Sequence, residues 1–565
     1  MVWSALTEGF AEALKRAGLW SPERLARLEL SIPRDTGHGD WTTNLALLLA
    51  RETGRPPRAV AEALIAAFPR DPAQFAAIEV AGPGFINLRY ADAFLSGLPA
   101  RILAAGALDP EARRGFGCHD HARGEKILVE YVSANPTGPL NVVNARAAAV
   151  GSALVRLLNA TGHAAAGEYY VNDAGTQVDL LGESVAARFA EHLGLARAFP
   201  ENGYQGEYLR DLAGELDPPA ARAALGRPDG AAWFRDRALE RMLESQRRDL
   251  SGYGAEYARW FRESELHARG EVMRTLESLR ERGMVYEAEG ATWVRTSSFG
   301  DDKDRVVVRS NGAPTYLLPD IAYHRDKRAR GFRYAIDLWG PDHHGHILPL
   351  QAALQALGLE SGFLEVLIVQ QVNLLSGGQP VRMSKRAGEF VTLGDLVEDI
   401  GADCAKFFFL MRSTNAHLDF DLDLARRQND ENPAYYVQYA HARIASILRY
   451  AAERGLEPSA AAGAEEPALA DPAELLLARR LAAFPEVVRG AAFAREPHRL
   501  PAYLLDTAAI FHRFYHACRV VTEDQALSIA RLRLAEATRL VLHNGLALMG
   551  VSAPQRMERA AEAAT

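Results

Sequence analysis

The pattern of apolar and polar positions divides this chain of 565 residues into three parts. In the first, residues 1–108, apolar residues recur at helical spacing, as over 59–68, and β-forming residues occupy the short run 85–88. A Gly-Pro-Gly cluster at 82–84 predicts a turn just before that run. This part is therefore expected to be a small domain of helices and strands, followed by a charged, glycine-containing linker at 109–124.

The second part, residues 122–390, opens with the run 126–132, which is short, apolar and rich in β-forming residues, as in a buried parallel strand. A Pro- and Gly-rich loop follows, and then an alanine-rich helical pattern over 145–160. Strand, tight loop and helix in this order open a nucleotide-binding α/β unit, so a Rossmann-like parallel sheet is predicted. Residues from about 185 to 275 are helix-like, charged and irregular, and predict an insertion between two halves of the sheet. Further strands are expected at 305–309, 334–338 and 366–372.

The last part is almost entirely helical in pattern. Residues 391–430 are expected to form a connecting segment, and residues 431–565 an all-α domain that an alanine- and proline-rich loop interrupts at 458–472. The expected fold class is thus α/β in the middle of the chain, with an α+β domain before it and a helical bundle after it.

Composition places the chain among ordinary soluble globular proteins, with 48% hydrophobic and 24% charged residues. No apolar run approaches the roughly 18 residues of a membrane span, and the N-terminus lacks the features of a signal peptide. The cysteines Cys118, Cys404 and Cys518 lie far apart, which argues against a disulfide framework and for a reducing, cytoplasmic location. His119 and His121 flank Cys118, but no second cysteine pair can complete a closed zinc site, so no structural metal is expected.

Three segments carry candidate chemistry, and the first is the loop 133–140 after the first predicted strand of the sheet. A helix begins near Asn141. A loop that leads into a helix N-terminus can cradle a phosphate, because free backbone N–H groups point at the anion. On its own this pattern is weak, since most turns between a strand and a helix bind nothing.

The second segment is the basic loop 382–388, which contains Arg382, Lys385 and Arg386. Such a loop can neutralise charge on a transferring phosphoryl or nucleotidyl group. Taken alone, a run of this length is more often a solvated surface loop. The formal net charge of −8 counts against a nucleic-acid binder but does not exclude one, because a local basic face can still bind phosphate.

The third segment, residues 339–346, directly follows the predicted strand 334–338. Ligands of open α/β sheets collect at the carboxyl ends of the strands. The three histidines and Asp342 of this segment could bind a metal, but their spacing matches no standard zinc signature. A nucleotide-binding role accounts for Gly340 and Asp342 equally well.

Together the three segments resemble class I aminoacyl-tRNA synthetases, which carry a His-x-Gly-His signature, a Gly-x-Asp segment and a Lys-Met-Ser-Lys loop in this order. The sequence within and around these motifs resembles the arginyl-tRNA synthetases in particular, and the resemblance covers nearly the whole chain. The stretches that carry it are residues 129–139, 168–175, 314–316 with Asp320, 432–443, 38–40 with Asn44, and 82–87.

The resemblance implies a Rossmann-like catalytic domain with an insertion, an N-terminal domain that contacts tRNA and a C-terminal bundle that binds the anticodon. It implies an arginine–tRNA ligase whose partners are L-arginine and tRNA(Arg), with ATP and Mg²⁺ as cofactors. A monomer without membrane association is expected.

The same resemblance implies roles for individual residues. For catalysis these are Lys385 and Arg382 with Asn141 and Asn144. For ATP binding they are Pro136, Gly138, Asn141, Asn144, Gly340, Asp342, His344, Met383, Ser384 and Lys385. For arginine they are Glu130, Ser133, Asn135, Tyr316, Asp320 and Asp342. For tRNA they are Asn44, Phe85, Tyr435, Tyr436 and Tyr439.

The chemistry of these residue types suits the implied roles. A guanidinium binds carboxylates bidentately, so Asp320 is expected to face it, with Tyr316 as a flat wall and donor. Glu130 and Asn135 are expected to face the polar end of the amino acid. Tyrosines can stack on splayed RNA bases, although aromatic residues at helical spacing are commonly core, so we expect the three tyrosines to divide between the two roles.

One segment departs from the family pattern. Where the signature should read His-x-Gly-His, this chain reads Asn141-Val142-Val143-Asn144, and Ala147 stands where a glycine is often found. Asparagine can donate a hydrogen bond but cannot become cationic, and losing one transition-state donor costs on the order of 3 kcal/mol. Val143 also places a branched side chain where the signature glycine lets adenine lie against the backbone. Both ATP affinity and the rate of activation are therefore expected to fall.

Two functions stay open. In the first, the chain is an arginine–tRNA ligase whose activation step is impaired by the altered signature. In the second, it is a non-activating paralogue that binds arginine, arginyl-tRNA or a partner in a specialised pathway. Arginine-dependent ATP–pyrophosphate exchange with cognate tRNA present separates the two.

Overall fold

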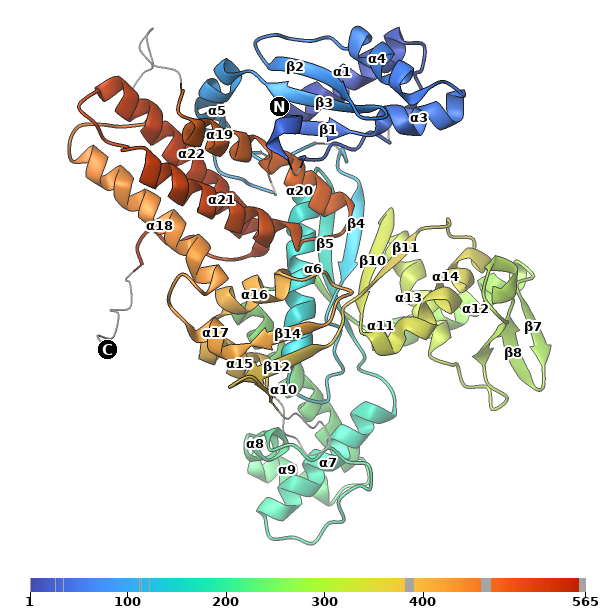
Figure 1. Cartoon of the computed structure of the whole chain (residues 1–565). Helices are drawn as coiled ribbons and strands as arrows, with labels where there is room; N and C mark the ends of the chain where they lie inside the picture. The colour runs from blue at the N-terminus through green and yellow to red at the C-terminus, as the bar shows by residue number, and fades with distance from the viewer. Residues whose placement is uncertain are drawn as a thin grey trace.

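A computed structural model gives the fold (Figure 1) and describes all residues except 1, 26, 34, 111, 113, 121, 382–390, 459–468 and 558–565. The N-terminal part is a three-stranded antiparallel sheet of order β1-β3-β2. Its strands are β1 (Trp41–Thr43), β2 (Phe75–Ala81) and β3 (Phe85–Tyr90), and its helices are α1 (Val2–Arg16), α2 (Pro22–Leu25), η1 (Thr36–His38), α3 (Leu45–Thr53), α4 (Pro57–Ala67) and α5 (Asp92–Ala105). The predicted helix 59–68, the strand 85–88 and the turn before it are confirmed as α4, β3 and the β2–β3 connection.

The middle of the molecule is a five-stranded, all-parallel sheet of order β11-β10-β4-β5-β6. Its strands are β4 (Lys126–Glu130), β5 (Ala164–Val171), β6 (Arg259–Arg262), β10 (Tyr334–Trp339) and β11 (Leu364–Ile368). The chain runs outward from β4 to β6 and then returns to the other side of β4 with β10, which is the Rossmann order. Ligands of such sheets bind where the strand order reverses, here between β4 and β10.

The predicted strands had mixed outcomes. Those at 126–132 and 334–338 are confirmed as β4 and β10. The run 366–372 is not one strand, because β11 ends at Ile368 and β12 (Val372–Ser376) begins a different sheet. The run 305–309 is confirmed as β9 (Arg305–Val308), but it pairs in a small antiparallel sheet with β7 (Val285–Ala288) and β8 (Ala291–Val294).

Helices cover both faces of the parallel sheet. On one face, α6 (Val142–Ala160) packs in one core with Ile127 and Val129 of β4. Small residues let α6 approach closely, since a Cβ on Gly151 would lie 2.2 Å from the Tyr131 ring. On the other face, α13 (Leu317–Ala329) and α14 (Ile347–Ala356) share a second core with Ala335 and Leu364.

The predicted insertion is a separate group of helices at the lower end of Figure 1. They are α7 (Thr176–His192), α8 (Tyr208–Gly214), α9 (Pro218–Leu225) and α10 (Gly230–Gly252), and they enclose a core of their own. The helices span residues 176–252, since β6 already belongs to the sheet. Two helices, α11 (Glu263–Ala268) and α12 (Glu271–Glu281), and the short turns η2 (Thr296–Phe299) and η3 (Pro341–His346) complete the middle part.

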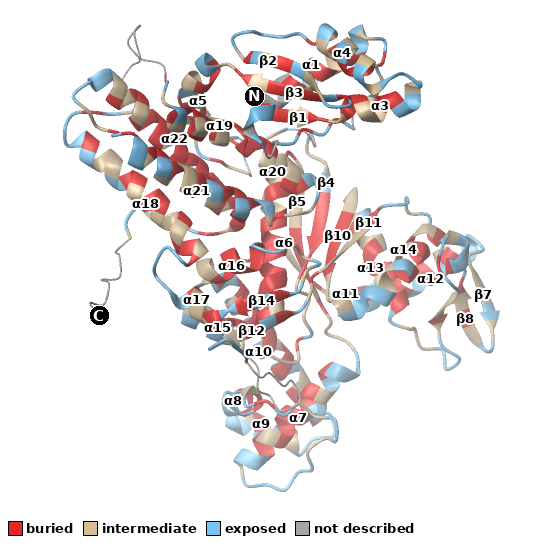
Figure 2. Cartoon of the chain, in the orientation of Figure 1, coloured by how far each residue is buried: buried red, intermediate tan, exposed pale blue. Residues whose placement is uncertain are grey.

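A connecting segment joins the sheet to the C-terminal bundle. It contains β12, β13 (Gln379–Pro380), β14 (Leu418–Asp421), α15 (Leu393–Ile400), α16 (Ala402–Leu410) and α17 (Leu422–Arg426). The bundle consists of α18 (Pro433–Ala452), α19 (Pro472–Ala482), α20 (Phe484–Phe493), α21 (Arg499–Ala517) and α22 (Gln525–Met549). One cluster of buried apolar residues extends from the N-terminal domain through α6 into this bundle, and Figure 2 shows buried residues along most of α6. Within the described ranges, no helix is long and apolar enough to cross a membrane.

Candidate functional site

A row of three buried carboxylates crosses the sheet at the point where the strand order reverses. Glu130, the last residue of β4, stands in register with Asp337 of β10 on one side and with Glu168 of β5 on the other. All three side chains are buried. Because a buried charge is costly unless it is paired and hydrogen-bonded, the row needs partners from another element.

Helix α13 supplies partners for the first two carboxylates. The Nζ atom of Lys327 lies 2.7 Å from Oε2 of Glu130 and 2.8 Å from Oδ1 of Asp337, and Nε2 of His324 lies 2.9 Å from Oδ2 of Asp337. Burial alone would raise the pKa of Asp337, but Lys327 and His324 together hold it well below its usual range. Burial outweighs Lys327 at Glu130 and raises the pKa of that carboxyl.

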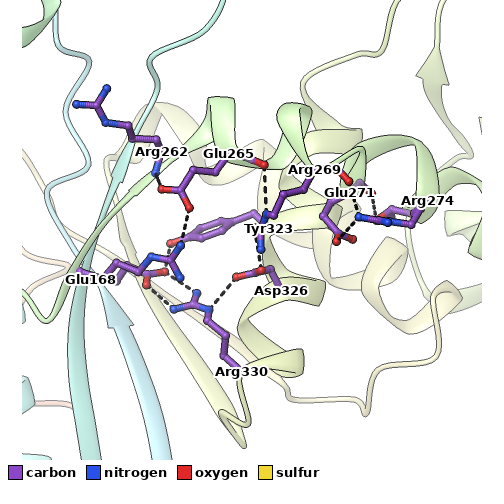
Figure 3. Close-up of polar contacts among 11 residues, drawn as sticks. Glu168, Arg262, Glu265, Arg269, Glu271, Arg274, Tyr323, Asp326 and Arg330 are labelled. Atoms are coloured by element: carbon purple, nitrogen blue, oxygen red, sulfur yellow. Dashed lines mark hydrogen bonds and ion pairs between the residues drawn. The ribbon is translucent and has the colours of Figure 1, made fainter.

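The third carboxylate is bound at the C-terminal end of the same helix (Figure 3). Arg330 donates two hydrogen bonds to the two oxygens of Glu168, at 2.6 and 2.8 Å, and the Tyr323 hydroxyl donates a third at 2.7 Å. Arg330 also forms an ion pair with Asp326 at 2.8 Å, and Asp326 pairs with Arg269 at 3.1 Å. This cluster attaches the far end of α13 to β5 and to the turn between α11 and α12.

Asp320 lies in the first turn of α13, one turn before His324. Among the described residues, no lysine, arginine or histidine forms an ion pair with its carboxyl. Burial, reinforced by the carboxylates of Glu130 and Glu263, raises the pKa of Asp320 to about 8. A carboxyl in this setting can bind a cation that enters from outside, because such a cation relieves the unfavourable burial.

The backbone just after β4 is strained. Val132 and Ser133 have φ angles of 71° and 38°, in the left-handed region that residues other than glycine rarely adopt. Such conformations cost on the order of 1–3 kcal/mol each and gather at functional sites. The Ser133 hydroxyl donates to Oε1 of Glu130 at 3.0 Å and accepts from the Tyr170 N–H at 3.0 Å. The strained turn therefore places Ser133 against the carboxylate row.

Two residues of the insertion, which no sequence pattern marked, hold the loop 133–140 in place by hydrogen bonds. Gln246 of α10, fully buried, donates from Nε2 to the carbonyl oxygens of Asn135 at 3.3 Å and Gly138 at 3.0 Å. Tyr208 of α8 donates to the carbonyl oxygen of Thr137 at 2.6 Å. The Asn135 side chain is exposed and Pro136 is buried. A lone glutamine on an irregular, charged helix gave no local signal, because its partners lie more than 100 residues away in sequence.

The altered signature caps the helix that follows it. Oδ1 of Asn141 accepts from the N–H groups of Val143 at 2.9 Å and Asn144 at 3.2 Å, while Oδ1 of Asn144 accepts from the Asn141 N–H at 3.0 Å. This is a reciprocal capping box. It uses backbone donors that the N-terminus of α6 would otherwise offer to an anion. Val143 is half-buried against the core.

The flank of the basic loop lies against this helix start. Asn141 forms an isolated β-bridge with Thr392, and the Leu393 N–H donates to the Leu140 carbonyl oxygen at 2.8 Å. The chain therefore returns from the basic loop directly beside the altered signature. The predicted residues Arg382, Met383, Ser384 and Lys385 lie outside the described residues.

The third segment forms the short turn η3 after β10. A Cβ on Gly340 would lie 2.5 Å from Oδ1 of Asp342, so a side chain here would displace that carboxylate. Asp342 and His344 are exposed. The Tyr316 side chain is 62% exposed and its hydroxyl lies 3.0 Å from Nδ1 of His346. Tyr316 is thus an exposed residue beside η3, four residues before Asp320.

No metal centre is assembled in the parts of the chain that the structure describes, where no group of three or more His, Cys, Asp or Glu side chains could hold an ion. Cys118 donates a hydrogen bond to the Arg114 carbonyl oxygen at 3.0 Å, and His119 contacts the Pro485 carbonyl oxygen at 2.7 Å. His119 therefore joins the linker to α20, Cys118 bonds within the linker, and His121 lies outside the described residues.

The residues expected to contact tRNA lie on two domains. Asn44 precedes α3 and is half-buried, and Phe85 begins β3 with 38% of its side chain exposed. On α18, Tyr435 is buried, whereas Tyr436 and Tyr439 are only half-buried and lie beside a histidine of α21, with ring centroids 5.3 and 6.5 Å from it. Tyr435 is a core residue, and the other two rings remain partly accessible.

Three family models match the chain. The arginyl tRNA synthetase N-terminal domain matches residues 4–90, the catalytic domain of class I (R) tRNA synthetases matches residues 260–410, and the DALR anticodon binding domain matches residues 437–557. The catalytic match begins after β5, so it does not extend over the loop 133–140 or the altered signature.

Full-length relatives match from end to end. The chain is 46% identical to the arginine–tRNA ligase of Moorella thermoacetica and 43% identical to that of Bacillus subtilis, and each match covers 98% of both chains. A crystal structure described as a putative arginyl-tRNA synthetase from Campylobacter jejuni is 35% identical, with a TM-score of 0.75 over 83% of this chain and 100% of that one. The Thermus thermophilus arginyl-tRNA synthetase shares the fold with a TM-score of 0.78 at 24% identity, covering 99% and 100% of the two chains. With these matches over its whole length, the chain belongs to the arginyl-tRNA synthetase family.

Proposed function

We propose that the chain is an arginine–tRNA ligase that takes arginine into the crevice between β4 and β10. The proposal rests above all on Asp320, a carboxyl near the Glu130 carboxylate that has no cationic partner among the described residues. A guanidinium carries a delocalised positive charge and a planar fork of donors that matches a carboxylate. Tyr316 and Asn135 are both exposed and are proposed to close over the bound amino acid.

ATP is proposed to bind between the start of α6 and the turn after β10. The loop 133–140 is held by Gln246, and Gly340 leaves room beside Asp342 and His344. The fit is partial, because the capping box already uses the N–H groups of Val143 and Asn144. Magnesium would arrive with the nucleotide, since the described residues offer no ligand set for it. We therefore expect ATP to bind, but more weakly than at an uncapped helix start.

The proposed reaction needs no protein nucleophile. A carboxylate oxygen of arginine attacks the α-phosphorus of ATP, and the bond to the leaving pyrophosphate breaks to give arginyl-adenylate. A ribose hydroxyl at the 3′ end of the tRNA then attacks the activated carbonyl and releases AMP. The protein contributes positioning and charge stabilisation. Arg382 and Lys385 are proposed to neutralise charge on the phosphates, and Asn141 and Asn144 to donate from their neutral amides.

The test is arginine-dependent ATP–pyrophosphate exchange, measured with and without tRNA(Arg). Exchange that requires arginine and is not supported by lysine or citrulline is the expected result. Calorimetric titration with L-arginine alone should show binding independently of the chemistry. A chain that neither binds arginine nor exchanges pyrophosphate would contradict the proposed function. Sedimentation should show the expected monomer, and a cytoplasmic location stays a prediction.

The altered signature favours one second candidate. If Asn141 and Asn144 serve only to cap α6, the chain would bind arginine or arginyl-tRNA without activating the amino acid. Clear arginine binding combined with silent exchange, in the presence of tRNA, would support this non-activating paralogue. Robust exchange by the unaltered chain would exclude it.

A further inference from the structure

Basic side chains on one face of α13 match the three buried carboxylates strand by strand. The carboxylates stand in register across three neighbouring strands, and each is bound by a side chain of this helix or of its C-cap. The basic residues are spaced three residues apart, so they lie on one face of the helix. From β10 to β5 the carboxylates are Asp337, Glu130 and Glu168, and the basic residues are His324 and Lys327 of α13 and Arg330 at its C-cap.

Lys327 occupies the centre of this arrangement. Its side chain is fully buried, and its Nζ atom bridges Glu130 of β4 and Asp337 of β10. Nζ also lies 4.3 Å from the centroid of the Tyr323 ring. Oε2 of Glu130 is held by Lys327 and Oε1 by the Ser133 hydroxyl, so the carboxylate is fixed at both oxygens.

His324 joins the first turn of α13 to this cluster. Its Nδ1 lies 2.8 Å from the carbonyl oxygen of Asp320, and its Nε2 lies 2.9 Å from Oδ2 of Asp337. Nε2 also lies 3.3 Å from Nζ of Lys327. Lys327 thus pairs with both Glu130 and Asp337, whereas Asp320 forms no ion pair with a described lysine, arginine or histidine.

We propose that Lys327 is a positioning residue for arginine recognition, although arginine does not touch it. By joining α13 to the ends of β4 and β10, it sets the first turn of the helix against the sheet. Asp320 is then placed to face the guanidinium while Glu130 is held towards the polar end of the amino acid. This inference rests on the proposed function, because it presumes that the crevice takes arginine.

The experiment measures L-arginine binding by calorimetry, with L-citrulline as the neutral isostere, so that the result does not depend on ATP chemistry. Lys327→Met should weaken arginine binding by at least about thirtyfold. Without Lys327, the buried carboxylates of Glu130 and Asp337 lose their shared ion-pair partner and Glu130 is no longer held in place. Arg330→Met is the matched control at the far end of α13. It should lower the thermal midpoint by a similar amount and change arginine affinity by less than about threefold.

A double variant separates positioning from charge balance. Lys327→Met with Asp337→Asn removes one positive and one negative charge, so the cluster keeps its net charge and should regain thermal stability. If Lys327 positions Glu130, arginine binding stays weak in the double variant. The double variant can also be measured if Lys327→Met alone does not fold. Recovery of affinity together with stability, or unchanged affinity in Lys327→Met, would overturn the inference. Loss of arginine binding in the unaltered chain would instead overturn the proposed function.

Discussion

Asn141 and Asn144 cap the first turn of α6 for each other, each accepting a hydrogen bond from the other's backbone N–H at 3.0–3.2 Å. The segment that departs from the family signature is therefore an ordered helix start with its own stabilising contacts. Because the two side-chain oxygens face the helix, only the amide hydrogens remain to meet a phosphate. The altered segment thus has a structural role that can be separated from its effect on ATP.

Restoring the family signature should raise the rate of arginine activation and lower the stability of the fold. The combined substitutions Asn141→His, Val143→Gly and Asn144→His should raise the rate of arginine-dependent pyrophosphate exchange by about a hundredfold, because cationic donors return to the phosphates. The loss of the cap should destabilise α6 by about 1 kcal/mol, with a further loss from glycine in the helix, seen as a lower thermal midpoint.

The control for that experiment is Asn141→Asp. Aspartate caps a helix as well as asparagine does, so the thermal midpoint should stay close to that of the unaltered chain. Its carboxylate repels phosphate, however, and exchange should fall at least about tenfold. If the triple variant gains no activity, the defect does not lie in the signature.

Arginine affinity should depend on pH through Asp320. Its pKa is raised to about 8 in the free protein, so the carboxyl is mostly protonated at neutral pH, and a guanidinium must displace that proton. Affinity should therefore rise up to about tenfold per pH unit from about pH 6 towards 8 and then level off. Calorimetry in buffers of different ionisation enthalpy should detect proton release on binding.

Asp320→Asn tests whether Asp320 makes the free protein less stable as the pH rises. The pKa of Asp320 is raised from 3.8 to about 8 on folding, so this group makes the fold lose stability as the pH rises from about 4 to about 8, with no further change above that. The variant should lose less stability than the unaltered chain over that range, and its arginine binding should be weak and independent of pH. A pH-dependent affinity that persists in Asp320→Asn would assign the titration to another group.

Gln246 should matter for ATP although it lies in the insertion. Gln246→Glu places a carboxylate oxygen opposite the carbonyl oxygens of Asn135 and Gly138, where the amide now donates. The loop should loosen, and the KM for ATP should rise about tenfold or more, since an unsatisfied buried contact costs on the order of 1–3 kcal/mol. The KM for arginine should change less. Equal changes in both constants would indicate a general loss of folding.

Substitutions of the α18 tyrosines should have different effects according to how deeply each ring is buried. Tyr435→Ala should lower the thermal midpoint, because a buried ring leaves a cavity. Tyr436→Ala should instead weaken tRNA binding, through loss of a partly accessible ring, with little effect on arginine binding. Filter binding with tRNA(Arg), together with thermal unfolding of both variants, checks the division. A stable Tyr435→Ala variant that loses tRNA would reverse the assignment.

The sequence alone determined much of this protein. Local patterns predicted α4, α6, β3, β4 and β10, because periodicity and turn chemistry are properties of neighbouring residues. Sequence motifs spread between residues 38 and 443 indicated the family. Strand β5 was not predicted, because it begins with three alanines and a glycine rather than β-forming residues. The run 366–372 could not be divided, because apolar content does not reveal where one strand ends and another sheet begins.

Only the tertiary structure decided how the charges meet. Asp337, Glu130 and Glu168 belong to three strands separated by more than 30 residues each, and register across a sheet is invisible to any local pattern. In the sequence, no local pattern distinguishes Lys327 or His324 from other polar residues, and Gln246 is one more polar residue of the insertion. Their roles arise because burial forces each charge and each amide to find a partner, and the partners come from distant elements that only the fold brings together.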